Sequence, residues 1–160
     1  MRPTIPLSDW RIAVDLVASK KIRRQTGHPA EGCTCDQCRS WRKAADTAFP
    51  RTIAEELERL GVEKARPMDL YVSREANGVV EFRVMYHIAG KIISGPSPWF
   101  EHSEFGKMHN YHFVQSEPTS IGLRVSTTKD SFEYAPDRPS GTTSDILCLD
   151  FRLQVRDAAA

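Results

Sequence analysis

Hydrophobic residues recur at helical spacing in the first third of the chain and alternate with polar residues further on. Apolar side chains at positions 10, 13, 14, 17 and 18 share one helix face, which predicts a helix over about 9–24 with Ser8 as its N-cap. Residues 1–6 are expected to form an irregular arm. A second helix is predicted from about Asp36, and a third from about Pro50 to Leu60, where Gly61 suits the C′ position.

From Met68 onward the hydrophobic period becomes two, which is typical of strands. The predicted strands cover residues 68–74, 79–89, 110–115, 120–127 and 146–155, with Gly90 ending the second of them. Each has one apolar face, so we expect an antiparallel sheet with one packed side and one wet side, with His87 on the wet side. The predicted fold class is α+β, with about three N-terminal helices covering one face of a five- to six-stranded, mainly antiparallel sheet.

Length and charge add little to this pattern. A chain of 160 residues predicts one domain, 1–160, with a helical part at 1–66 and a sheet part at 67–160. Net charge is +1, distributed as +4 over residues 1–66 and −3 over the remainder. We see no secretion signal and no apolar run of the roughly 20 residues that span a bilayer. A cytoplasmic location is therefore predicted, where clustered thiols favour metal or redox chemistry over disulfides.

Three of the four cysteines lie within six residues of one another, and a histidine precedes them. Cys35 and Cys38 have the spacing of a chelating turn, while Cys33 and Cys35 are closer, so the backbone at Gly32 has to curl. With His28 as fourth ligand, His28, Cys33, Cys35 and Cys38 form a Cys3His set, which predicts a closed, structural zinc site.

Other interpretations of the cysteines stay open. A CxxC pair at a helix start lowers a thiol pKa, so Cys35 and Cys38 could form a redox pair. Thiolates also suit copper(I), and free, tolerated thiols are a third possibility. Cys148 lies on a predicted strand and is expected to be an ordinary sheet residue.

A second polar cluster occupies residues 101–112, within and after a long connection at 94–109. His109 and His112, with Glu104 nearby, are weak candidates for metal ligands or a general base, and they support the alternative of a metal-dependent enzyme. The metalloprotease pattern HExxH is absent from the sequence.

The sequence suggests two kinds of binding partner, a protein and a nucleic acid. Trp99 and Phe100 follow two prolines in the long connection and would anchor a protein partner. Cations near the cysteines, among them Arg39, Arg42 and Lys43 together with the run at 20–24, support the alternative of a nucleic-acid-binding zinc knuckle. No membrane partner is expected. The leading hypothesis is a non-enzymatic binding or accessory protein with a structural zinc site.

Overall fold

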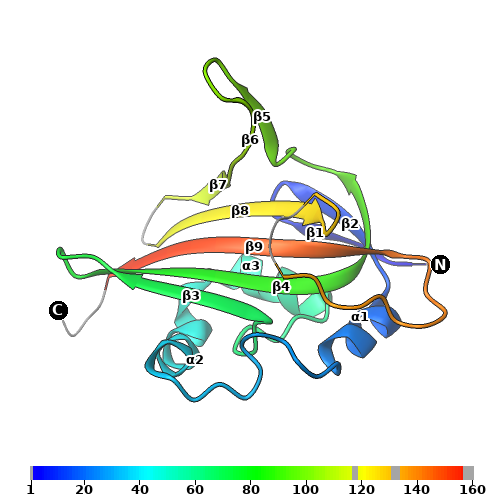
Figure 1. Ribbon diagram of the computed structural model, residues 1–160, viewed down its shortest axis with the longest axis horizontal. Helices are drawn as coiled ribbons and strands as arrows, with labels where there is room; N and C mark the ends of the chain where they lie inside the picture. The colour runs from blue at the N-terminus through cyan, green and yellow to red at the C-terminus, as the bar shows by residue number, and fades with distance from the viewer. Residues whose placement is uncertain (1, 117–118, 131–133, 157–160) are drawn as a thin grey trace.

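The computed structural model describes residues 2–116, 119–130 and 134–156, and its main element is a curled antiparallel sheet of seven strands (Figure 1). In chain order the elements are β1 (Thr4–Leu7), β2 (Trp10–Val14), α1 (Leu16–Arg23), α2 (Asp36–Ala48), α3 (Arg51–Arg59), β3 (Asp69–Arg74), β4 (Val79–Ser94), β5 (Trp99–His102), β6 (Gly106–His109), β7 (His112–Gln115), β8 (Ser120–Thr127) and β9 (Asp145–Arg156). The sheet order is β1-β2-β4-β9-β8-β7, with β3 also paired to β4, and β5 and β6 form a separate two-stranded hairpin.

The predicted fold class was wrong, because the chain begins with strands and not with a helix. Residues 4–7 and 10–14 form the hairpin β1–β2, in place of an irregular arm and the first half of a helix; Met1 lies outside the described residues. Trp10, Ile12 and Val14 are buried at every second position, so the period here is two. Helix α1 starts only at Leu16, where the side chain of Asp15 accepts a hydrogen bond from the amide of Ala18 (2.9 Å).

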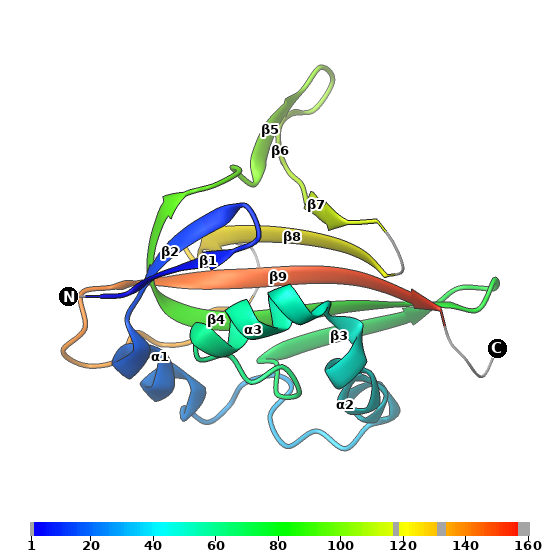
Figure 2. The ribbon, with the colours of Figure 1, turned by 180° about the vertical axis from the view of Figure 1, so that it is seen from behind.

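The strand β4 is longer than predicted, because Gly90 continues it and does not end it. A Cβ atom at Gly90 would lie 2.5 Å from the carbonyl oxygen of Ala13. Because Gly90 has no side chain, β2 can approach closely and pair with the last part of β4, from Gly90 to Ser94. The β1–β2 hairpin lies on the same side of the sheet as α3 (Figure 2).

One face of the sheet and two helices enclose the main core. The alternating residues predicted for β4, β8 and β9 are confirmed as buried, among them Phe82, Leu123 and Phe151. Trp41 of α2 contacts Phe82, and Phe49, which follows α2, contacts Phe151, with ring centroids 5.2 Å and 5.0 Å apart. The amide of Ser8 in the β1–β2 turn donates to Glu56 of α3 (2.9 Å), which fixes the hairpin to the helix.

The sequence pattern predicted that the opposite face of the sheet is exposed to solvent, but part of this face is buried. Ala18 and Ile22 of α1, with Met68, pack on Ala89 and Ile146 and bury that end of the face. Further along, the carboxylate of Asp150 is 2% exposed and binds two arginines and a tyrosine. His87 lies between these two regions and is also buried, so its expected place on a wet surface was wrong.

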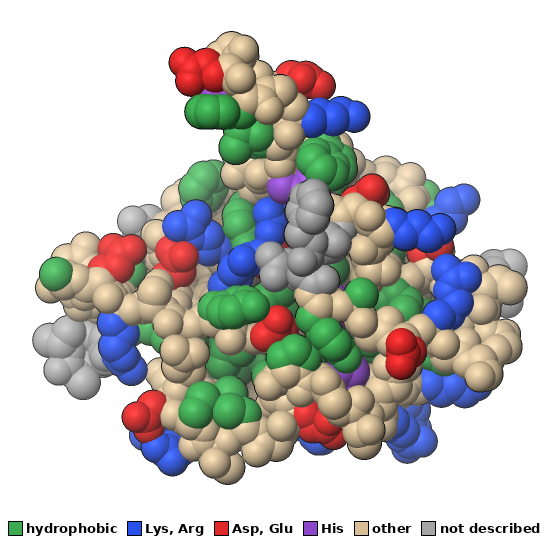
Figure 3. Space-filling model, viewed as in Figure 1, with side chains coloured by type: hydrophobic (Ala, Val, Ile, Leu, Met, Phe, Trp, Pro, Cys, Tyr) green, Lys and Arg blue, Asp and Glu red, His purple; other side chains and the backbone are tan. Residues whose placement is uncertain are grey.

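The β5–β6 hairpin occupies most of the long connection and projects away from the body of the protein (Figure 1). Hydrophobic side chains lie on its surface (Figure 3). At its base, the hydroxyl of Tyr111 donates to Asp150 (2.9 Å), and the Tyr111 side chain packs on Gly122. The hairpin is therefore anchored to the sheet through Tyr111.

Burial of His87 predicts a specific pH dependence of stability. Desolvation, and then the nearby His28, lower the pKa of His87 to about 4, against weaker opposing effects of the Tyr134 backbone and Asp150. Between pH 6.5 and about 4, the His87 side chain is protonated in the unfolded chain but stays neutral in the folded protein. The free energy of unfolding should thus fall from pH 6.5 to about 4, by up to about 3 kcal/mol, and change no further below pH 4 through this group.

Urea unfolding between pH 4 and 7, with a chelator present throughout, would measure this effect without a contribution from bound metal. The variant His87→Gln, which cannot titrate, should show a flatter profile over the same range. Equal slopes in the two proteins would contradict the assignment.

Candidate metal centre

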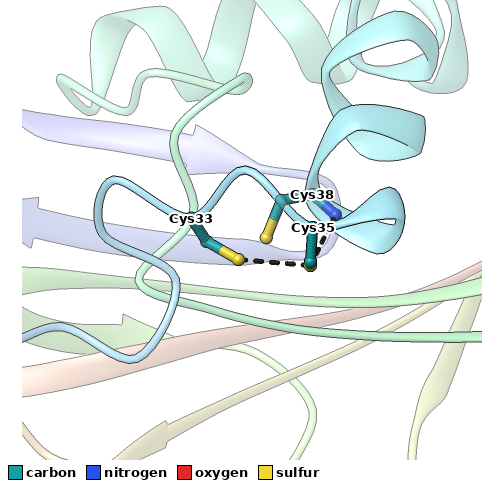
Figure 4. Close-up of side chains that lie close together, drawn as sticks. All are labelled: Cys33, Cys35 and Cys38. Carbon is teal, nitrogen blue, oxygen red and sulfur yellow. Dashed lines mark hydrogen bonds between the residues drawn. The ribbon is translucent and has the colours of Figure 1, made fainter.

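The three clustered cysteines meet where an irregular loop enters α2 (Figure 4). Cys35 is the N-cap residue of the helix: its sulfur accepts a hydrogen bond from the amide of Cys38 at 3.5 Å. The backbone before it curls through Gly32, whose φ of 61° is the left-handed conformation that glycine adopts easily. This curl brings the Cys33 sulfur to 3.1 Å from the Cys35 sulfur.

All three sulfur atoms lie within 4.8 Å of one another. Zinc–sulfur bonds of about 2.3 Å at tetrahedral angles place two ligand sulfurs roughly 3.8 Å apart, so small side-chain movements suffice to bind one ion. Across residues 2–116, 119–130 and 134–156, this is the single group of three or more histidine, cysteine or acidic side chains close enough to hold a metal ion.

The thiols differ in acidity because their surroundings differ. Cys35 is exposed, and the amide of Cys38, followed by the thiols of Cys33 and Cys38, lowers its pKa to about 7. Cys38 is buried, and desolvation, followed by its two cysteine neighbours, raises its pKa to about 12. At neutral pH the Cys35 thiol is therefore partly ionised and the Cys38 thiol is protonated, so a divalent cation would have to displace the Cys38 proton.

The structure does not bring His28 to the cysteines. Its Nδ1 atom lies 2.9 Å from the Tyr134 hydroxyl, and its Nε2 atom lies 3.1 Å from the carbonyl oxygen of Ile22. Both ring nitrogens are thus engaged in hydrogen bonds that hold the loop against α1. The predicted four-ligand set is reduced to three cysteines in this conformation, and the fourth position is not filled by a described side chain.

The residues proposed for an enzyme site are dispersed. The His109 ring contacts Trp99 at a tilt of 53°, with centroids 3.9 Å apart, and burial followed by the charge of Arg124 lowers the pKa of His109. The Nε2 atom of His112 lies 2.8 Å from a carboxylate oxygen of Asp9, in the β1–β2 turn. Glu104 is exposed in the turn of the β5–β6 hairpin. Among the described residues, they belong to no group of side chains close enough to hold a metal ion.

The predicted binding residues lie in two separate places. Trp99 and Phe100 are on β5, half-buried and exposed respectively. On α2, Arg39 pairs with Asp36, Arg42 donates to the carbonyl of Cys33 (3.0 Å), and Lys43 is exposed. Binding of a protein or a nucleic acid by these residues stays a prediction.

Sequence reasoning missed the charged cluster around Asp150. Arg83 and Arg124 lie 3.0 Å and 2.8 Å from one oxygen of this carboxylate. The pattern of β9 does show Asp150 between apolar residues, but the arginines come from β4 and β8. The sequence alone does not show that β4 and β8 are the neighbours of β9, so it could not predict that Arg83, Arg124 and Asp150 meet.

Comparison with known proteins identifies no relative. The chain matches no protein-family model, no curated protein and no solved structure. None of the helices in the described part of the chain has the length and apolar character needed to cross a membrane. The function is therefore argued from the site itself.

Proposed function

We propose that this protein binds one zinc ion through Cys33, Cys35 and Cys38, and that the ion fastens the loop between α1 and α2. The observation that carries the proposal is the approach of the three sulfur atoms to within 4.8 Å of one another. Three thiolates are a donor set that zinc favours, since it is a borderline-soft ion without a geometric preference of its own.

The position of the cluster supports a structural role for the ion. Residues 24–35 contain no helix or strand, and backbone hydrogen bonds hold this loop at separate points, among them the bond from the Ala30 amide to the Met68 carbonyl (3.0 Å). Cys38 is buried at the margin of the main core, and Cys33 packs against it. An ion bound to both would connect the loop to the first turn of α2, in addition to the packing of Ala30 and Cys33 on the core.

Metal content tests the proposal directly. The protein, purified under reducing conditions without a histidine tag, should contain one zinc ion per chain by elemental analysis. The triple variant Cys33→Ser, Cys35→Ser, Cys38→Ser should contain none, whereas Cys148→Ala, which alters the cysteine outside the cluster, should retain a full complement. A metal-free wild-type protein, or copper in place of zinc, would refute the assignment; the metal-free result would favour redox chemistry at Cys35.

We further propose that the β5–β6 hairpin is the surface through which the protein binds a protein partner. An isolated two-stranded hairpin is marginally stable in water, yet this one exposes several large apolar side chains. Phe100, Phe105 and Met108 are 38%, 69% and 37% exposed, and Phe113 beside the hairpin is 74% exposed. Apolar anchors of this kind suit a protein surface better than a polyanion.

Site-specific photo-cross-linking in cells tests this second part. A photoreactive residue at position 105 should form a discrete cross-linked protein adduct. The same residue at position 77, in the remote turn between β3 and β4, serves as the matched control. Absence of an adduct at 105, or equal adducts at both positions, would contradict the proposal.

A further inference from the structure

A hollow of about 560 Å³ lies between the end of α1, the loop that carries the cysteines and the segment before β3. Its volume is in the range typical of small-molecule sites. The lining comes from three stretches of chain, at 20–24, 28–42 and 63–70.

The hollow is strongly positive. Five cations line it, Lys20, Arg23, Arg24, Arg42 and Arg66, against two carboxylates, those of Glu31 and Glu63. The local charge is therefore +3, compared with +1 for the whole chain. A concave surface of one sign concentrates oppositely charged ligands.

Not all of these charges are neutralised within the protein. Arg23 and Arg66 both approach Glu63, at 3.8 Å and 3.5 Å, so one carboxylate is shared between two guanidinium groups. Lys20 and Arg24 form no side-chain hydrogen bond or ion pair with any residue in the described ranges. These two side chains are exposed at the rim and remain available for a ligand.

The lining of the hollow is mixed, and part of it is apolar. Trp41, Met68 and Leu70 contribute to its lining and are at most 9% exposed. The indole nitrogen of Trp41 already donates to the carbonyl of Lys64 (2.9 Å), so its polar atom is satisfied and the ring is left as a wall. Apolar walls with a few charged groups at the mouth select a ligand that has both characters.

We propose that this hollow binds a small organic anion, an aromatic or aliphatic body with one acidic head group held by Lys20 and Arg24. Carboxylate, sulfonate and phosphate groups share the required chemistry. Arg24 can bind two oxygens of such a group at once, while Lys20 supplies a point charge. Lys20 and Arg24 do not belong to the cysteine cluster, although Cys38 forms part of the lining of the hollow.

A fluorescence titration with 1-anilinonaphthalene-8-sulfonate tests the proposal, since this probe combines an aromatic body with one anionic group. The double variant Lys20→Ala, Arg24→Ala should bind it at least about tenfold more weakly than the wild type. The matched control Lys21→Ala, Lys91→Ala removes the same charge from exposed positions outside the hollow and should bind within twofold of the wild type. Circular dichroism would confirm that both variants are folded.

Three further measurements make the result specific. N-phenyl-1-naphthylamine, which keeps the aromatic body without the acid, should bind at least about tenfold more weakly than the sulfonate. Phe105→Ser should leave sulfonate binding unchanged, which excludes the β5–β6 hairpin as the binding surface. Displacement by 1-naphthoate and by 1-naphthyl phosphate should reveal which head group is preferred.

Several outcomes would overturn the proposal. These are absence of sulfonate binding, equal weakening in both double variants, equal binding of the uncharged analogue, or loss of binding in Phe105→Ser. The zinc content of the Lys20→Ala, Arg24→Ala variant separates this inference from the zinc proposal, because this variant should lose sulfonate binding and keep the metal content of the wild type.

Discussion

Replacing Asp150 by alanine is expected to lower the free energy of unfolding by about 3–5 kcal/mol, since it leaves two arginines without their buried counter-charge. The side chain of Asp150 is 3% exposed, and those of Arg124 and Arg83 are 14% and 27% exposed. The hydroxyl of Tyr111 would lose its acceptor as well, which releases the base of the β5–β6 hairpin. Urea unfolding at pH 7 measures the difference.

Asp145→Ala provides a control on the same strand. Asp145 pairs with Arg138 at 3.4 Å, but both side chains are about half exposed, so the variant should lose less than about 1 kcal/mol. Asp150→Asn, which keeps an acceptor and removes the charge, should fall between the two. Similar stabilities for Asp150→Ala and Asp145→Ala would show that the buried cluster contributes no more than a surface ion pair.

Replacing Cys38 by serine is expected to weaken zinc binding more than about 100-fold. Removing a residue that only hydrogen-bonds to a metal ligand typically weakens binding by about 10–100-fold, and the loss of a ligand itself should exceed this. Cys38 is the buried cysteine of the cluster, and it also belongs to the main core. Loss of the ion should loosen residues 25–50 and leave the strands β4, β8 and β9 protected. Hydrogen exchange followed by mass spectrometry, with zinc affinity from chelator competition, would record both effects.

His28→Gln is the informative companion to this variant. In the structure His28 bonds to Tyr134 and to the Ile22 carbonyl, so its replacement should leave zinc affinity within about threefold of the wild type. Loss of zinc in His28→Gln as large as in Cys38→Ser would instead restore the four-ligand Cys3His site. Unchanged zinc affinity in Cys38→Ser would remove Cys38 from the ligand set.

The parts of the fold that the sequence predicted well are those with long, regular patterns. The helices α2 and α3 and the strands β4, β8 and β9 each extend over at least eight residues, so their periods are unambiguous. The hairpin β1–β2 was missed because five residues, Trp10–Val14, satisfy both a helical and an alternating pattern. Gly90 was misread because a glycine that ends a strand and one that admits a neighbouring backbone look alike in sequence.

The candidate site was predictable only where it is local. Cys33, Cys35 and Cys38 are close in sequence, so their spacing was enough to predict a common site. The role of His28 depended on the path of the loop, which directs its ring to Ile22 and Tyr134. The hollow and the Asp150 cluster are assembled from segments far apart in the chain, so no local pattern could have revealed them.

The ligand shell of the ion tests most directly whether three cysteine sulfurs of this chain bind one zinc ion. X-ray absorption spectroscopy at the zinc edge measures the number and distance of its ligands. We expect three sulfur atoms at about 2.3 Å and one oxygen or nitrogen at roughly 2.0–2.1 Å, in a monomeric sample with one zinc per chain. A shell with two or fewer sulfurs, or with four, would contradict this expectation.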